Sequence, residues 1–330
     1  MGTRYNNLFT NPSFEATSDT VEARRNYAPN PSPANAAYWN ATGGATLSYT
    51  TAEKHLGTGS IQVVTSGATG DGGYSYNYRT IPTGEAWSFG VWVKAPIGVG
   101  LYLFTRFTDG SSLDVPFTGT GDWQFVSAST TNSGASGTNV MFGVRAGGGG
   151  FTGTFYFAEM LVEKSSTLGD YFDGSTSPDT DLPEAWVGTP NASESTLSKT
   201  TVAAVTSTTA YQSAKWAIQG TKSLYVPTGG TATVTLAASS TAVVVARYPG
   251  QVLTVGSASE TSAVTDQTMK ATGLASVTLG PGYWDTLLIV EGTYAGEYFD
   301  GNTDLEPGLN PFWSGTPDSS TSHLWGLPVL

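Results

Sequence analysis

The chain has 330 residues, only 12% of them charged, and its net charge is −12. This acidic balance argues against a nucleic-acid-binding protein or a basic membrane-surface protein, because both need clustered Lys and Arg. With no cysteine and only two histidines, His55 and His323, we expect no disulfides, no Cys-ligated zinc and no His-cluster metal site. No apolar run is long enough to span a membrane and no secretory leader is visible, so we expect neither membrane insertion nor Sec export.

Two repeats organise the chain. The opening motif Asn7–Ser13 recurs shortly afterwards as Asn26–Ser32, with Asn-Pro-Ser at the end of each copy. A second motif, Tyr-Phe-Asp-Gly, occurs at Tyr171–Gly174 and again, much further along the chain, at Tyr298–Gly301. We interpret the chain as two copies of one module, preceded by a vestigial start within an extended arm, residues 1–25.

Alternation of apolar and polar residues predicts strands along most of the remaining sequence, separated by Gly- and Asp-rich turns. We therefore predict an all-β protein, in which residues 26–175 form a jelly-roll β-sandwich and residues 199–302 form a second, smaller β-sandwich. The Pro- and Ser-rich stretch 176–198 is expected to be an extended connector. Residues 303–330 are expected to be a C-terminal arm.

The predicted strand from Trp87 to Lys94 offers a candidate glycan-binding face. Its uniformly apolar side should face the core, which leaves Trp92 on the other side. The following strand directs Tyr102 and Arg106 outward by the same alternation. Aromatic rings stack on pyranose C–H faces and Arg bonds hydroxyl groups, so we predict glycan contacts at Tyr76, Tyr78, Trp92, Tyr102 and Arg106. The alternative is that a loop or another subunit covers this face.

Four apolar side chains on irregular segments are candidate assembly contacts: Trp186, Trp313, Trp325 and Leu327. A Trp on an extended segment is a typical anchor in protein interfaces. The alternative for Trp186 and Trp313 is that each packs its loop onto the module it follows. The apolar end, Leu324–Leu330, either folds back on the second module or docks into a partner.

Nothing in the sequence specifies a catalytic or metal site. A glycosidase needs two carboxyl groups about 5–9.5 Å apart across a cleft, and no spacing of the turn residues Asp109, Asp114 and Asp122 indicates one. Asp173 and Asp300 of the Tyr-Phe-Asp-Gly motifs are expected to cap turns, because calcium takes about 6–8 oxygen ligands. We therefore predict no enzymatic activity and no cofactor.

The segment from Asn26 to about Gly174 resembles carbohydrate-binding-module jelly rolls of the family 4/9 type. The resemblance is carried by the Asn30-Pro-Ser opening, Trp39, Gly59-Ser60-Ile61, Trp87–Ala95, Asp122-Trp123 and the closing strand Thr154–Glu163. In those modules a Glu soon after the opening ligates a structural calcium, and Glu15 has that place in the first copy. The second copy has no such carboxylate, and Ala158-Glu159 stands where the family often has paired aspartates, so the resemblance does not support calcium here.

The Tyr-Phe-Asp-Gly motifs, each followed by Trp-x-Gly-Thr-Pro, and the Asn11-Pro-Ser-Phe14 opening resemble minor tail proteins of long-tailed phages that infect actinobacteria. This resemblance covers almost the whole chain. It implies a virion protein at the tail tip, made in the host cytoplasm, whose partners are other tail proteins or further copies of itself, for example in a homotrimer. A host cell-wall glycan would be its ligand during adsorption, unless its role is purely structural. The alternatives are a carbohydrate-binding protein outside a virion and a glycan-degrading enzyme.

Overall fold

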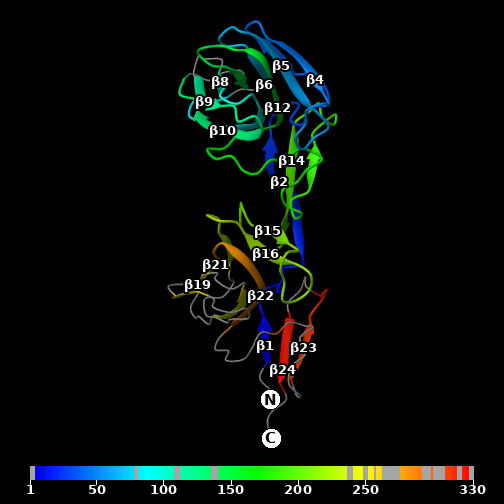
Figure 1. Cartoon of the computed structure of the whole chain (residues 1–330). Helices are drawn as coiled ribbons and strands as arrows, with labels where there is room; N and C mark the ends of the chain where they lie inside the picture. Colours follow the sequence, from blue (N-terminus) through cyan, green and yellow to red (C-terminus); the bar gives the residue numbers. More distant parts are fainter. Residues whose placement is uncertain are drawn as a thin grey trace. The chain divides into compact units, whose positions relative to one another are not determined.

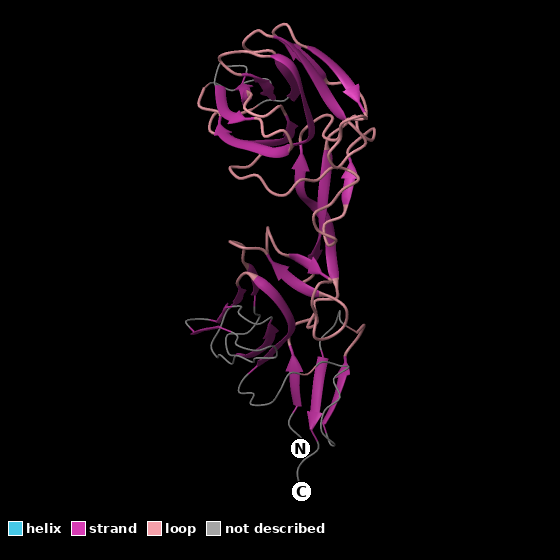
Figure 2. Cartoon of the chain, viewed as in Figure 1, coloured by secondary structure: helices cyan, strands magenta, loops and turns pink. Residues whose placement is uncertain are grey.

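The computed structural model contains strands, turns and loops but no helix in the part of the chain that it describes (Figure 2). The all-β prediction is therefore confirmed, and no helix able to cross a membrane is found among these residues. The described residues are 4–77, 81–107, 112–134, 140–235, 241–247, 252–255, 258–261, 276–291, 299, 309–317 and 322–326.

The chain divides into two compact units, and one is inserted into the sequence of the other. Residues 22–198 form the inserted unit, whereas residues 1–21 and 199–330 together form the split unit. The boundaries fall within β2 (Thr17–Asn26) and β14 (Ser195–Val202), which are neighbours in a three-stranded sheet with β13 (Glu184–Trp186). This division differs from the expected one, because the segment Met1–Val21 belongs with the C-terminal part of the chain.

The inserted unit is built on two antiparallel sheets, each five-stranded in the described residues (Figure 1). The β7 sheet has the order β10 (Trp123–Thr131), β7 (Ala86–Lys94), β12 (Thr152–Glu163), β5 (Ser60–Ser66) and β4 (Thr46–Thr50). The β8 sheet has the order β3 (Trp39–Thr42), β6 (Gly72–Asn77), β11 (Val140–Ala146), β8 (Gly100–Phe107) and β9 (Ser112–Thr118).

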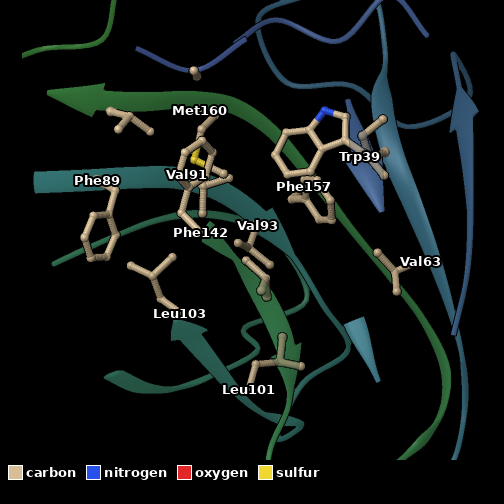
Figure 3. Packing of buried hydrophobic residues seen from close by; sticks show 14 of the residues in the cluster. Trp39, Val63, Phe89, Val91, Val93, Leu101, Leu103, Phe142, Phe157 and Met160 are labelled. Atoms are coloured by element: carbon tan, nitrogen blue, oxygen red, sulfur yellow. The ribbon is translucent and has the colours of Figure 1, made fainter. Parts of the chain in front are cut away.

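The core of the inserted unit lies between these two sheets. Alternate residues of β7 point inward, and Trp87, Phe89, Val91 and Val93 are at most 1% exposed, as the period of two predicts. The β8 sheet supplies opposing side chains, and Figure 3 shows Leu101, Leu103 and Phe142 in the same cluster as Phe89, Val91 and Val93 of β7. Each such burial contributes about 1.5–3 kcal/mol, so this layer fixes which face of each sheet remains outside.

The repeated opening motif ties the same part of each unit together. The buried Asn26 side chain donates to the carbonyls of Met160 and Phe172 and accepts from the amides of Ala28 and Val162, at 2.8–3.1 Å. The buried Asn7 side chain donates to the carbonyl of Leu287 and accepts from the amides of Phe9 and Ile289, at 3.0–3.2 Å. Each opening is thus bonded to one long strand of its own unit, β12 or β22 (Gly282–Glu291), which we call the closing strand of that unit. The first opening therefore belongs to the split unit and is not vestigial.

A matching irregularity marks the closing strand of each unit. Glu159 in β12 has φ 43°, and Thr286, at the equivalent place in β22 (Gly282–Glu291), has φ 52°. Each lies where the strand pairing shifts register, which identifies a β-bulge. An acidic side chain is buried at each bulge: Glu159 is the bulge residue in β12, and Asp285 precedes the bulge residue in β22.

The split unit combines strands from both ends of the chain. Its larger sheet has the order β15 (Tyr211–Ser213), β16 (Ser223–Val226), β22, β1 (Arg4–Asn7), β24 (Ser322–Gly326) and β23 (Leu309–Trp313), with β18 (Thr241–Arg247) also pairing β22. The second sheet has the order β17 (Ala232–Thr235), β21 (Ser276–Leu279), β19 (Val252–Val255) and β20 (Ala258–Thr261).

Both segments expected to be arms contribute strands to the larger sheet of the split unit. β1 pairs with β22 on one side and with β24 on the other, so its backbone groups are used in two ladders. Phe9 and Phe14 then join a core that contains Trp284 and Leu287. The stretch 176–198 likewise carries β13, whose Trp186 pairs with Ser195 of β14.

Candidate functional site

The predicted glycan-contact residues do not share one face. Trp92 lies in β7, whereas Tyr102 and Arg106 lie in β8, which belongs to the other sheet. Because the core fills the space between the sheets, the outward side chains of β7 and β8 lie on opposite faces of the sandwich. Tyr76 is in β6 of the β8 sheet, although its side chain is outside the description, and Tyr78 lies outside the described residues.

A loop covers Trp92. The His55 ring stacks on it with ring centroids 3.9 Å apart and an interplanar angle of 26°, and Phe125 packs at 5.5 Å. His55 is in turn paired through Nδ1 with Glu159 Oε2 at 3.1 Å. The alternative of a covering loop therefore describes Trp92, and we remove this residue from the candidate site.

The outer face of the β8 sheet gathers aromatic and charged side chains, which we call the aromatic–arginine face: Tyr74, Tyr102, Phe104, Arg106, Asp114 and Arg145. The register of the strands sets it out in rows, with Tyr102 opposite Arg145 and Phe104 opposite Asp114. Gly143 lies between Tyr74 and Phe104 in the pairing of β6, β11 and β8, so the centre of the face carries no side chain. Sequence analysis selected Tyr102 and Arg106 but not Phe104 of the same strand. Asp114 was expected in a turn and lies instead within β9. Tyr74 and Arg145 were missed because their strands, β6 and β11, are distant from β8 in sequence.

Two guanidinium groups on this face share one carboxylate. Asp114 Oδ1 accepts from Arg106 at 3.1 Å, and Oδ2 accepts from Arg106 at 3.2 Å and from Arg145 at 2.8 Å. The Arg145 guanidinium also lies over the rings of Tyr102 and Phe104, at 5.4 and 5.6 Å from their centroids. All three charged side chains remain 23–33% exposed, so they are held in place and still reach solvent.

A hollow of about 240 Å³ adjoins Tyr102 at one end of the face. Pro116 and Thr118 of β9 line one side, and Gly147 and Gly148 line the other. A Cβ added at Gly148 would meet no atom within 4 Å, so this end is open. The arrangement can accept an extended ligand that runs across the sheet and past its edge.

A second cluster surrounds the buried Glu159 in a pocket of about 250 Å³. Its Oε1 accepts from the amides of Leu56 and Gly57 at 3.1 and 2.8 Å, and burial raises the pKa of Glu159 above its ordinary value. These bonds hold the loop that carries His55. Nearby, Asp173 Oδ1 accepts from the amide of Ser175 at 2.7 Å, as expected for a residue that caps a turn.

Two further carboxylates are used to bind loop backbone in the split unit. Glu15 Oε1 accepts from the amides of Thr221 and Lys222 at 2.6 and 2.7 Å. Asp285 Oδ2 accepts from the amides of Ile218 and Gln219 at 2.6 and 2.8 Å, and burial raises the pKa of Asp285 to about 7. Within the described ranges no three His, Cys, Asp or Glu side chains form a group that could hold a metal ion.

The predicted assembly contacts are placed in part. Trp186 packs on its own unit: its Nε1 donates to Ser175 Oγ at 3.1 Å, and a Cβ added at Gly174 would overlap its ring. Trp313 is half-buried in β23, where it pairs with Ser322. Trp325 is in β24 with its side chain outside the description, and Asp300 and Leu327 lie outside the described residues.

No protein-family model and no curated protein matches the chain. Among solved structures, the CBM22-1 xylan-binding domain of Paenibacillus barcinonensis Xyn10C is similar over 46% of this chain and 100% of that domain, with 11% identity and a TM-score of 0.35. The tandem CBM22-1–CBM22-2 domain of the same protein is similar over 94% of this chain and 98% of its own, with 11% identity and a TM-score of 0.36. The enzymatically active domain of bacteriophage CBA120 tailspike protein 4 is similar over 42% of this chain and 21% of its own, with 12% identity and a TM-score of 0.34. These likenesses identify no ligand or partner for this chain.

Proposed function

We propose that this protein binds a glycan through the aromatic–arginine face. The observation that carries the proposal is the placement of the partly exposed Tyr102 beside Arg106 and Arg145 on the outer side of the β8 sheet. Phe104 lies beneath the two guanidinium groups and is only 3% exposed, so it supports them and offers no ring to a ligand. Aromatic rings offer apolar surface to the C–H side of a sugar, and guanidinium groups donate in a fixed geometry to its oxygens. The bonds to Asp114 hold both guanidiniums before any ligand arrives, which lowers the entropic cost of binding.

The role we propose is binding without catalysis. Asp114 is the one carboxylate on the described part of this face, and it is engaged by two arginines. Glycoside hydrolysis needs a pair of carboxyl groups on either side of the scissile bond. A single carboxylate that is already bonded to two arginines favours recognition of a sugar over its cleavage.

The biological setting we propose is the tail tip of a phage, where the chain would be a minor tail protein that contacts the host cell wall. The support is the repeated Tyr-Phe-Asp-Gly and Trp-x-Gly-Thr-Pro motifs. Partners in this setting would be other tail proteins or further copies of the chain, such as a homotrimer. A carbohydrate-binding protein outside a virion is the second candidate, because the aromatic–arginine face would serve it equally well.

The first experiment measures binding of the purified chain to isolated cell-wall glycans, with Tyr102→Ala as the test variant. Loss of one stacking ring should weaken binding about fivefold, which corresponds to about 1 kcal/mol. Tyr156→Ala is the matched control, because Tyr156 lies on β12 in the other sheet. Equal weakening by both variants, or no binding by the wild type, would refute the proposed face.

The proposed place at a phage tail tip is tested separately from glycan binding by the aromatic–arginine face. Antibodies against the chain should label the tail tip of phage particles that carry it, and light scattering should show self-association if copies of the chain pair with each other. Label confined to the medium, with none on particles, would favour the second candidate. A clean monomer at micromolar concentration would contradict a homotrimer formed by this chain alone.

A further inference from the structure

The aromatic–arginine face differs in charge from the rest of the molecule. The chain has 14 basic and 26 acidic side chains and a net charge of −12. On the described part of this face the balance reverses, because Arg106 and Arg145 are set against Asp114 alone. A site for an uncharged sugar in so acidic a chain has no need of a second guanidinium.

No other carboxylate described near the face neutralises the extra charge. Asp71 precedes β6, and its carboxylate is used within its own turn, where it accepts from the amides of Gly44, Ser66 and Ala68 and from the Ser66 hydroxyl, at 2.6–3.3 Å. Those bonds lower the pKa of Asp71, so it stays ionised where it is and remains with its own donors. The second positive charge therefore stays on the face.

Arg145 is the guanidinium with spare donors. One of its terminal nitrogens bonds Asp114, which leaves the other for a ligand. Its Nε also has no hydrogen-bond partner in the described structure, but it is buried and therefore out of a ligand's reach. Arg106, in contrast, uses both terminal nitrogens on Asp114 and donates to the carbonyl of Thr105 at 2.8 Å. The Arg145 guanidinium lies over the ring of Tyr102, and Tyr102 in turn lines the open hollow near the start of β8.

We propose that the glycan bound at this face carries an anionic group, a carboxylate or a phosphate, and that this group pairs with Arg145 while a neighbouring sugar ring stacks on Tyr102. This inference rests on the proposed function. An oxygen anion is the ligand that matches a planar guanidinium, because two parallel N–H groups meet two oxygens. The charge of the remaining surface then repels anions elsewhere, which directs them to this face.

The test uses cell-wall polysaccharide in three forms. One sample is untreated, one has its carboxyl groups reduced to alcohols with carbodiimide and borohydride, and one has its phosphodiesters removed with hydrofluoric acid. Untreated polysaccharide should bind at least about tenfold more tightly than the form that lacks the recognised anion. The treated sample that loses affinity tells whether the anion is a carboxylate or a phosphate. Raising the NaCl concentration about tenfold should reduce the difference in affinity between the untreated and the neutralised polysaccharide, since salt screens exposed charges.

Two variants act in opposite directions. Arg145→Gln should remove the preference for the anionic form while residual binding of the neutralised form persists, and Asp114→Asn should increase the preference, because it frees both guanidiniums. Lys164→Gln is the charge-matched control, since Lys164 follows β12 of the other sheet and pairs with Glu85. The Lys164→Gln variant should prefer the anionic polysaccharide over the neutralised form as strongly as the wild type does.

The outcomes separate the two claims. Absence of binding to untreated polysaccharide overturns the proposed function and this inference with it. Equal binding of all three forms by the wild type leaves the proposed function standing and overturns the anionic ligand. The anionic ligand is likewise overturned if Asp114→Asn weakens the preference for the anionic form, or if Lys164→Gln reduces that preference as much as Arg145→Gln does.

Discussion

Replacing Asn26 with alanine should destabilise the inserted unit more than any surface change of similar size. The substitution removes two donated and two accepted hydrogen bonds from a fully buried side chain, and it leaves the amides of Ala28 and Val162 and the carbonyls of Met160 and Phe172 without these partners. At about 1 kcal/mol for each bond, the free energy of unfolding should fall by about 4 kcal/mol. With a urea dependence of about 2 kcal/mol per M, the midpoint should fall by about 2 M.

Urea unfolding followed by hydrogen exchange and mass spectrometry reports each unit through its own peptides. Asn40→Ala is the matched control, because Asn40 is exposed in β3 of the same unit and should change stability by less than about 0.5 kcal/mol. Asn7→Ala should lower the midpoint of the split unit instead. If Asn26→Ala behaved like Asn40→Ala, the side chain would not be tying the closing strand, and if it acted on the split unit first, the division of the chain would be wrong.

Three further changes test other parts of the structure. Gly174→Ala should destabilise the inserted unit by about 1–3 kcal/mol and shift Trp186 fluorescence, because the new methyl group overlaps that ring; an unchanged spectrum would contradict the packing. Trp92→Ala should lower stability by about 2 kcal/mol but leave glycan affinity intact, because His55 covers the ring; a binding defect in the folded variant would return Trp92 to the site. Burial raises the pKa of Asp285 to about 7, so its stabilising contribution is present below the ordinary value near pH 4 and is lost as the pH rises through 7. The midpoint of the split unit should fall over that range in the wild type and stay level in Asp285→Asn.

The buried faces of individual strands were predictable from the sequence, because alternation is a local property. The apolar set of Trp87, Phe89, Val91 and Val93 faces the core as predicted. The partners of a strand are a different matter. β7 and β8 follow each other closely in sequence, yet β7 pairs with β10 and β12 while β8 pairs with β9 and β11.

That difference explains the error in the candidate site. Trp92 and Tyr102 both point outward, as predicted, but from strands that joined opposite sheets. Proximity in sequence favours a hairpin, whereas the choice of sheet depends on contacts with distant segments such as Val140–Ala146. Arg145, which supplies the second guanidinium of the face, comes from that segment and carried no local signal.

The repeats were visible in the sequence, but their meaning depended on long-range pairing. The two openings follow each other closely, whereas the two closing strands lie far apart, and this spacing shows that the units are nested. Treating each module as contiguous led instead to a vestigial start and an arm. Asn7, which bonds Leu287 and Ile289, belongs to a strand pairing that local sequence analysis cannot detect.

The position of β1 between β22 and β24 has a consequence for biosynthesis. A ribosome that has released residue 198 has supplied every residue of the inserted unit, which can then complete its fold during translation. Arg4–Asn7 is made before the inserted unit, yet its neighbours β22 and β24 arrive only with residues 282–291 and 322–326. β1 therefore waits for its partners until after the inserted unit has been made, and a chain cut short before residue 282 would keep a folded inserted unit while β1 lacked both neighbours.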